Sequence, residues 1–204
     1  MRLIAVSKTF PAEQVRAAAA AGLVDFGENR VQEALPKIEA VADRRLEWHL
    51  VGALQSNKAR RAAAAFAWIH SVDRVDLLTR LDGAAAAAGT TPRLLLQFNL
   101  GGEARKAGAE VQDAPALFAA AARCTRARVC GLMVLPPWSE DPAAARPYFR
   151  QLRVLRDDLE RSGVDPALLR ELSMGMSRDL EAAVQEGATI VRVGTAIFGP
   201  RTRR

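Results

Sequence analysis

The sequence lacks long hydrophobic runs and has few aromatic residues. No apolar stretch reaches the roughly 18 uncharged residues that a membrane-spanning helix requires, and the apolar run after Met1 is too short for a signal peptide. We therefore expect a cytoplasmic protein without a membrane partner. Aromatic residues make up 5% of the 204 residues and hydrophobic residues 50%, so alanine and aliphatic side chains must build the core.

Cysteine and histidine are equally scarce, with two of each. Cys124 and Cys130 match the spacing of neither a CxxC redox pair nor a zinc knuckle, and His49 and His70 are too few for a usual structural zinc site. We expect no metal. Both cysteines are expected to be buried free thiols in a reducing compartment.

The length is that of one domain, which we assign to residues 1–204, at roughly 150 residues per domain. Lys and Arg outnumber Asp and Glu by 29 to 23, a formal net charge of +6, which indicates either an anionic ligand or a basic surface. A nucleic-acid-binding module is a further possibility, prompted by the basic residues 201–204. No recognised nucleic-acid-binding fold or set of stacking aromatics accompanies them, so we expect no nucleic-acid partner.

Short apolar runs alternate with alanine-rich helical stretches along the chain. Eight runs have the length of strands: residues 3–6, 24–26, 48–51, 68–70, 94–100, 129–135, 169–173 and 190–193. Helices are expected between them, and several close on a glycine: residues 12–21, 30–41, 57–66, 74–88, 114–124, 141–161 and 178–186.

Strict alternation of strands and helices predicts right-handed crossovers and a parallel sheet. Eight strands make a closed (β/α)8 barrel of the TIM type the leading α/β architecture. An open doubly wound sheet is the alternative, because the second and fourth strands rest on three residues each. The absence of a glycine-rich dinucleotide-binding fingerprint after the first strand counts against it.

Polar residues at the carboxyl ends of strands are candidates for the site, since active sites of such barrels lie there. Lys8 follows the first strand, where partial desolvation would favour the neutral amine, a nucleophile toward aldehydes. Taken alone, a solvated lysine at a strand end is the commoner situation.

Two further strand ends carry residues suited to a phosphate. Ser177 follows the seventh strand, placed to cap the next helix, and Gly194 and Thr195 follow the eighth. Free N–H groups and a hydroxyl at a helix amino terminus bind phosphate, and the loops after strands 7 and 8 are the recurring phosphate site of these barrels. An ordinary helix cap is the alternative for Ser177 alone.

Arg192 lies within the eighth strand between two valines that face the opposite side. Its guanidinium therefore points into the barrel, where a charge needs a ligand or an acid. In a closed barrel the eighth strand pairs with the first, which brings Lys8 and Arg192 together beside the phosphate site. This combination fits pyridoxal 5'-phosphate, with the aldehyde at Lys8, the phosphate at Ser177, Gly194 and Thr195, and an unprotonated pyridine nitrogen at Arg192.

Motifs along the whole chain resemble those of the pyridoxal phosphate homeostasis proteins, single-domain relatives of the alanine racemase barrel. The matching segments are residues 5–9 (AVSKT), 26–33 (FGENRVQE), 48–58 (WHLVGALQSNK), 131–133 (GLM), 172–179 (LSMGMSRD) and 191–199 (VRVGTAIFG). The resemblance implies a barrel like the amino-terminal domain of alanine racemase and a Schiff base between Lys8 and pyridoxal phosphate. It further implies a cofactor pocket lined by Asn29, His49, Met176, Ser177, Arg192, Gly194 and Thr195.

Several positions stay open. His49 could equally be a hydrogen-bonded core residue, and Lys58 and His70 are assigned no role. The family usually has a helix ahead of the first strand that is not seen in this sequence, and commonly a histidine in place of Ala53.

The resemblance implies a monomeric protein of vitamin B6 homeostasis that holds pyridoxal phosphate on Lys8 and supplies it to apoenzymes or buffers it. The alternative is a low-activity amino-acid racemase that uses Lys8 as its base. Alanine racemases use a second base, a tyrosine from an additional domain, whereas the single tyrosine here is Tyr148 in an expected helix. The resemblance therefore favours a cofactor carrier over an enzyme.

Overall fold

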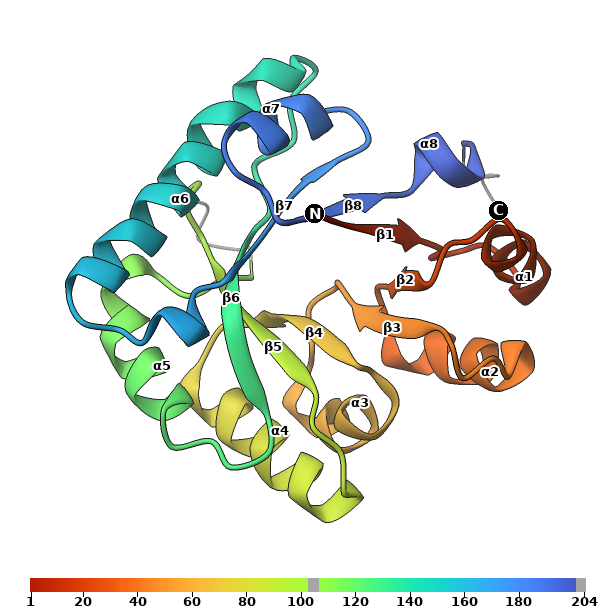
Figure 1. Cartoon of the computed structure of the whole chain (residues 1–204), viewed down its shortest axis with the longest axis horizontal. Coiled ribbons are helices and arrows are strands. Elements are labelled where there is room, and N and C mark those ends of the chain that lie inside the picture. Colours follow the sequence, from red (N-terminus) through yellow and green to blue (C-terminus); the bar gives the residue numbers. More distant parts are fainter. Residues whose placement is uncertain (103–106, 201–204) are drawn as a thin grey trace.

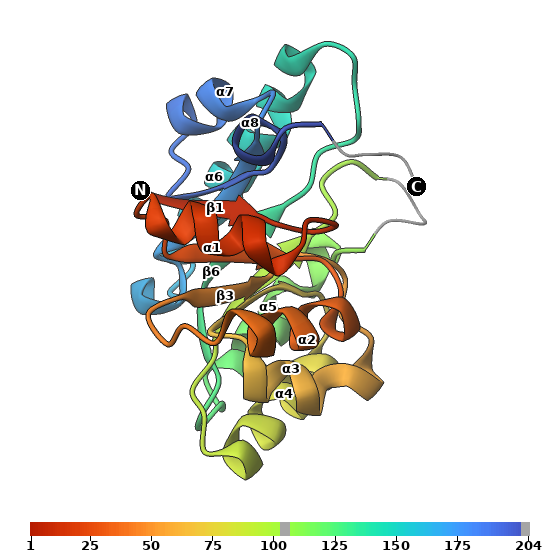
Figure 2. The same ribbon diagram turned by 90° about the vertical axis from the view of Figure 1, so that its right-hand side faces the viewer.

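The computed structural model describes residues 1–102 and 107–200, so the basic segment 201–204 lies outside the described residues. Eight parallel strands pair in sequence order and β8 pairs with β1, which closes the sheet into a barrel with the helices around its outside (Figures 1 and 2). The (β/α)8 barrel is confirmed, and the open doubly wound sheet is wrong. No helix in the described part of the chain combines the length and hydrophobicity needed to cross a membrane.

The elements follow the expected alternation closely. The strands are β1 (Arg2–Val6), β2 (Asp25–Glu28), β3 (Glu47–Leu50), β4 (Trp68–Val72), β5 (Arg93–Phe98), β6 (Arg128–Val134), β7 (Glu171–Met176) and β8 (Ile190–Val193). The α-helices are α1 (Ala12–Ala20), α2 (Val31–Val41), α3 (Ala59–Ala65), α4 (Val75–Ala88), α5 (Ala114–Ala121), α6 (Arg146–Arg161), α7 (Leu180–Gln185) and α8 (Thr195–Phe198). Short 3-10 helices lie at Ser56–Lys58, Val111–Asp113, Pro142–Ala145 and Pro166–Leu168.

The seventh strand lies later in the chain than residues 169–173, where the sequence predicts it. Asp165 accepts the N–H of Ala167 at 2.8 Å and caps a 3-10 turn, so the backbone at Leu169 still belongs to that turn. At its other end β7 continues past Ser173 to Met176, with a shift in its register against β8. The strand thus ends nearer to the cavity than expected.

Alternate residues of each strand face the barrel interior or the helices. Inside the barrel lies a small apolar cluster of Ile4, Val6, Val51, Trp68, Leu95, Met133 and Ile190. A much larger cluster fills the space between barrel and helices, and in α3 it includes the buried alanines Ala59, Ala62 and Ala63. Because alanine side chains are small, helices rich in alanine pack close to the sheet, which explains the alanine runs.

Strands β6 and β7 approach closely at Gly131, which lies opposite Glu171. A Cβ atom at position 131 would lie 2.0 Å from the Glu171 carbonyl oxygen, so only glycine fits there. This close approach fixes the spacing between the middle of β6 and the first residue of β7.

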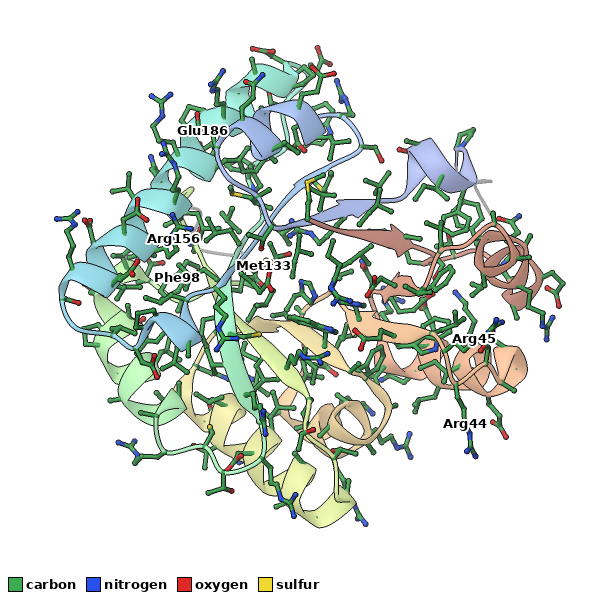
Figure 3. All side chains as sticks on the ribbon, in the orientation of Figure 1. Arg44, Arg45, Phe98, Met133, Arg156 and Glu186 are labelled. Carbon is green, nitrogen blue, oxygen red and sulfur yellow. The ribbon has the colours of Figure 1, made fainter. Side chains whose placement is uncertain are left out.

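A single buried carboxylate ties α6 to the end of α7 (Figure 3). Glu186 accepts hydrogen bonds from Arg146 at 2.8 Å, Arg150 at 3.3 Å and Arg153 at 3.0 Å, all on α6. The hydrogen bond from Arg146 is the largest cause that holds the pKa of Glu186 at about 2. The Glu186 carboxylate therefore stays charged at neutral and mildly acidic pH.

The two cysteines are free but only half-buried, which corrects the expectation of buried thiols. Cys124 lies in the turn between α5 and β6, close to the surface, and Cys130 lies in β6. Burial raises the pKa of Cys124 to about 11 and that of Cys130 to about 12. Both thiols are therefore protonated, and poorly nucleophilic, near neutral pH.

Candidate functional site

A cavity of about 580 Å³ opens among the segments that follow β1, β2, β3, β6, β7 and β8. This is the carboxyl-terminal face of the barrel, where sites of this fold lie. Seven of the eight residues expected at the site line the cavity: Lys8, Asn29, Met176, Ser177, Arg192, Gly194 and Thr195.

Lys8 lies just beyond β1 on the inner side of the barrel. Ile4 and Val6 belong to the cluster inside the barrel, and the alternation of side chains puts Lys8 on that same face. The chain then turns at Thr9, whose φ of 72° lies in a left-handed region that β-branched residues seldom adopt. The turn keeps the Lys8 backbone at the edge of the cavity.

The residue before Lys8 is anchored on the outer side of the barrel. Ser7 Oγ donates to Glu28 Oε1 at 2.7 Å, and Lys37 Nζ donates to the Ser7 carbonyl oxygen at 2.8 Å and to Glu28 Oε1 at 2.6 Å. Ser7 and Glu28 are fully buried. This small network fixes the backbone from which the Lys8 side chain enters the cavity.

The loops after β7 and β8 meet at the Ser177 hydroxyl. Ser177 Oγ accepts the N–H of Gly194 at 3.2 Å and that of Ala196 at 3.4 Å. Ala196 belongs to α8, a four-residue helix that the sequence patterns do not predict. Two backbone N–H groups and one hydroxyl therefore converge at the side of the cavity, an arrangement that suits an anion.

Ser177 is not the cap of the next helix, as its position in the sequence suggests. Helix α7 begins at Leu180, and Asp179 is its N-cap residue. The Asp179 side chain accepts the N–H of Met176 at 2.5 Å, which turns the chain back after β7. With the N-cap position taken by Asp179, the Ser177 hydroxyl is turned to the loop after β8.

Arg192 is buried, and its guanidinium donates to neutral groups. Its Nη1 donates to Ser173 Oγ at 2.6 Å and its Nη2 to the carbonyl oxygen of Val134 at 2.9 Å. Burial lowers the pKa of Arg192 to about 10, with the charge of Asp179 acting in the opposite direction. The guanidinium is thus charged at neutral pH, and no carboxylate among the described residues forms an ion pair with it. A buried cation at a cavity wall attracts an anionic ligand.

The strand ends of β2 and β3 form the opposite wall. Asn29 follows β2, and Gly52 follows β3. A Cβ atom at position 52 would lie 2.3 Å from the carbonyl oxygen of Asn29, so the two backbones approach too closely for any residue but glycine. The contact fixes where Asn29 stands on the cavity wall.

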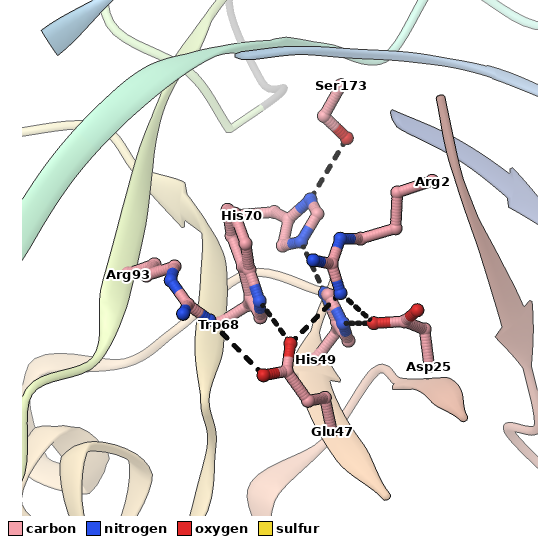
Figure 4. A network of polar contacts seen from close by, with 8 residues as sticks. All are labelled: Arg2, Asp25, Glu47, His49, Trp68, His70, Arg93 and Ser173. Atoms are coloured by element: carbon pink, nitrogen blue, oxygen red, sulfur yellow. Dashed lines mark hydrogen bonds and ion pairs between the residues drawn. The ribbon is translucent and has the colours of Figure 1, made fainter. Parts of the chain in front are cut away.

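His49 does not line the cavity, contrary to the pocket position expected from the resemblance. It lies two residues before Val51 in β3, fully buried, where it hydrogen-bonds Asp25 and His70 (Figure 4). The sequence-based alternative, a hydrogen-bonded core residue, describes its surroundings. His70 and Ser173 belong to the same buried network although the motifs assign them no role.

The rim of the cavity is apolar and exposed. Leu135, Trp138 and Met176 line it and expose 37%, 76% and 39% of their surface. Exposed large apolar side chains that gather at a cavity mouth are typical of a surface that meets a ligand or partner. The motifs did not single out Trp138, although a tryptophan after two prolines at a strand end is a signal that could have found it.

Comparison with known proteins identifies the family. The sequence-family model of the alanine racemase amino-terminal domain matches residues 1–202 of this chain. Curated relatives named pyridoxal phosphate homeostasis protein are 49% identical over 199 residues in Pseudomonas aeruginosa and 44% identical over 200 residues in Aquifex aeolicus. Both matches cover 98% of this chain, and they cover 84% and 87% of the two relatives. The chain belongs to the pyridoxal phosphate homeostasis protein family.

Solved structures agree with this membership. PipY of Synechococcus elongatus PCC7942 is 45% identical, with a TM-score of 0.92 for its structure without PLP and 0.90 for its structure with PLP bound. These matches cover 98% of this chain and 93% and 92% of the PipY chains. The family resemblance expected from the motifs is therefore confirmed.

More distant structures confirm the expected likeness to the alanine racemase barrel. Alanine racemase of Clostridium difficile 630 gives a TM-score of 0.74 at 11% identity, with all of this chain but only 53% of the racemase covered. At this identity the likeness concerns the fold alone.

Proposed function

We propose that the chain binds pyridoxal 5'-phosphate in the cavity at the carboxyl ends of the strands and serves the cellular homeostasis of that cofactor. It holds the cofactor reversibly on Lys8 and supplies or buffers it. The observation that carries this proposal is the presence of Lys8, the buried Arg192 and the Ser177–Gly194 anion site in one cavity. Family membership and the PLP-bound structure of PipY support it.

The donor set fits the cofactor group by group. The phosphate matches the segments of Ser177 and Gly194, where the N–H groups of Gly194 and Ala196 gather around the Ser177 hydroxyl and donate to its oxygen. The pyridine nitrogen matches Arg192, which can only donate hydrogen bonds and so favours an unprotonated acceptor. Asn29, Met176 and Thr195 complete the proposed contacts at the wall of the cavity.

The chain's residues divide the work of binding. Pyridoxal phosphate supplies an aldehyde with which a primary amine forms a reversible covalent link, with loss of one water. Lys8 is the amine, and the Ser7 anchor keeps its backbone fixed during attachment and release. Arg192 holds the ring nitrogen without giving it a proton, because the guanidinium keeps its own proton at neutral pH. Arg192 would therefore make the ring a weaker electron sink than an acidic partner would.

The residues that line the cavity favour a cofactor carrier over the racemase alternative. The only tyrosine of the chain, Tyr148, is not among the residues that line the cavity. Two-base racemisation therefore has no tyrosine to serve as the second base. We further propose apoenzymes of pyridoxal phosphate in the cytoplasm as recipients, with the exposed rim at Leu135 and Trp138 as the side from which the cofactor leaves.

A titration with pyridoxal phosphate, followed by visible absorption, tests the proposal. The wild-type protein should develop the band of a covalently bound cofactor, and Lys8→Ala should not. Lys58→Ala is the matched control, since Lys58 does not line the cavity, and it should behave like the wild type. A wild-type protein without such a band would rule out the proposed function.

A further inference from the structure

A continuous line of polar side chains crosses the interior of the barrel, starting at Arg192 on the cavity wall, and Figure 4 shows the part from Ser173 to Asp25. The interior of such barrels is usually filled by branched aliphatic residues. Here Arg192 Nη1 lies 2.6 Å from Ser173 Oγ, which lies 2.9 Å from His70 Nδ1. His70 Nε2 lies 3.1 Å from His49 Nδ1, and His49 Nε2 lies 2.9 Å from Asp25 Oδ1. Each of the five residues is at most 8% exposed. Burial of so many polar side chains carries a desolvation free energy that an apolar interior would avoid, which points to a functional role.

The Asp25 end of this line determines the position of each proton within it. At the lower end, Asp25 is ion-paired with Arg2, and hydrogen bonds with His49 and Arg2 outweigh burial to hold the pKa of Asp25 below its ordinary value. A carboxylate only accepts, so His49 Nε2 carries the hydrogen. In a neutral imidazole the other nitrogen then accepts, and His49 Nδ1 must receive its hydrogen from His70 Nε2.

The upper end is compatible with this assignment. His70 Nδ1 is left as an acceptor, so the Ser173 hydroxyl donates to it. Arg192 can only donate, so Ser173 Oγ accepts from it. The hydroxyl of Ser173 thus uses its one hydrogen toward His70 and a lone pair toward Arg192, and all four hydrogen bonds run in one direction from Arg192 to Asp25.

The opposite direction is disfavoured by charge. It would place the hydrogen of His70 on Nδ1, pointing at Ser173, and would require an additional proton on His49 to keep its bond with Asp25. That imidazolium would lie near two guanidiniums, Arg2 and Arg192. Burial and these charges lower the pKa of His70 well below its ordinary value, and burial lowers that of His49. Both rings therefore stay neutral.

We propose that Ser173 and His70 are positioning residues for the cofactor, which hold Arg192 through a one-way series of hydrogen bonds that ends at Asp25 of β2. His70 fixes the hydroxyl of Ser173 as an acceptor, and that acceptor fixes Nη1 of Arg192. Val134 fixes Nη2 of the same group. The guanidinium is thereby held at the cavity wall before any ligand arrives. The role toward the cofactor rests on the proposed function, whereas the proton arrangement belongs to the protein alone.

Nitrogen NMR of the ligand-free protein tests the arrangement directly. The chain has two histidines, so an untagged sample shows only the four ring nitrogens of His49 and His70. At neutral pH both rings should be neutral, with the hydrogen on Nε2. An imidazolium, or a hydrogen on Nδ1 of either ring, would overturn the proposal. In Ser173→Ala both rings should keep the hydrogen on Nε2, because Asp25 fixes His49 and His49 fixes His70.

A binding measurement tests the positioning role. Ser173→Ala should weaken pyridoxal phosphate binding about tenfold, because a hydrogen bond to a charged group is lost, and should shift the absorption of the bound ring. Ser173→Thr keeps the hydroxyl and should restore both. Ser162→Ala is the matched control, since that hydroxyl donates to Leu159 at the end of α6.

The outcomes separate the two proposals. If the wild type binds pyridoxal phosphate and Ser173→Ala binds it with the same affinity and the same spectrum, the positioning role is wrong while the proposed function stands. If the wild type does not bind it, the proposed function fails. The tautomers of His49 and His70 still decide whether the hydrogen bonds run in one direction from Arg192 to Asp25.

Discussion

Ile4 of β1 lies opposite Arg192 of β8 where the barrel closes. Lys8 comes four residues after Ile4 and so returns to the inner side of the barrel, at the end of the strand beside that of Arg192. Residues from the two ends of the sequence thereby line one cavity. Closure of the barrel, more than any single motif, brings Lys8 to the same cavity as Arg192.

Removal of the Ser177 hydroxyl should weaken the phosphate site selectively. Ser177→Ala leaves the N–H groups of Gly194 and Ala196 without the oxygen on which they converge, and takes one donor from the phosphate. We expect about a tenfold loss of affinity for pyridoxal phosphate and little change for pyridoxal, which has no phosphate. Titration of both compounds checks this, and an equal loss for both would argue against a phosphate contact.

Two glycines should respond to alanine in opposite ways. Gly131→Ala should destabilise the fold by about 1–3 kcal/mol, because the new methyl group would lie 2.0 Å from the Glu171 carbonyl oxygen. Gly83→Ala should stabilise by up to about 1 kcal/mol, since Gly83 lies inside α4 with nothing within 4 Å of the added carbon. Urea unfolding measures both. Equal effects would show that β6 and β7 leave room for a methyl group at position 131.

Acid should destabilise the α6–α7 contact through Glu186. Its folded pKa of about 2 is below its ordinary value of 4.5, so the unfolded chain binds the proton more readily. The stabilisation is therefore fully present above about pH 4.5 and is lost as the pH falls toward about 2. The pH dependence of unfolding should flatten over this range in Glu186→Gln. It should persist in Glu181→Gln, which alters an exposed carboxylate of α7.

Neither cysteine should react readily with thiol reagents in the folded protein. The pKa values of about 11 for Cys124 and about 12 for Cys130 leave little thiolate at neutral pH. Labelling with iodoacetamide near neutral pH should be slow in the native state and become fast in denaturant. Rapid labelling of Cys130 in the native protein would contradict its raised pKa.

Much of the fold and the cavity could be predicted from the sequence, for a physical reason. Strands buried on both faces are continuous apolar runs, and eight of them alternating with helices have few ways to pack. A charged residue such as Arg192 within such a run must then face the interior. Helix α8 could not be predicted because four residues carry no periodicity, and the N-cap position expected for Ser177 is occupied by Asp179.

The buried hydrogen-bond network of Arg192, Ser173, His70, His49 and Asp25 could not be predicted from motifs. Asp25, His49, His70 and Ser173 come from four different strands, and their contacts depend on the register with which the strands pair. One signal was available, because each of these residues stands at an inward-facing position of its strand. Only the closed barrel shows which of the inward positions meet.

The attachment of pyridoxal phosphate to Lys8 is the central claim, and borohydride reduction followed by peptide mapping tests it most directly. The chain has four lysines, at positions 8, 37, 58 and 106, so the modified peptide identifies its residue without ambiguity. We predict a single reduced adduct on the peptide that contains Lys8, absent from Lys8→Ala. An adduct on another lysine, or none at saturating cofactor, would contradict the account.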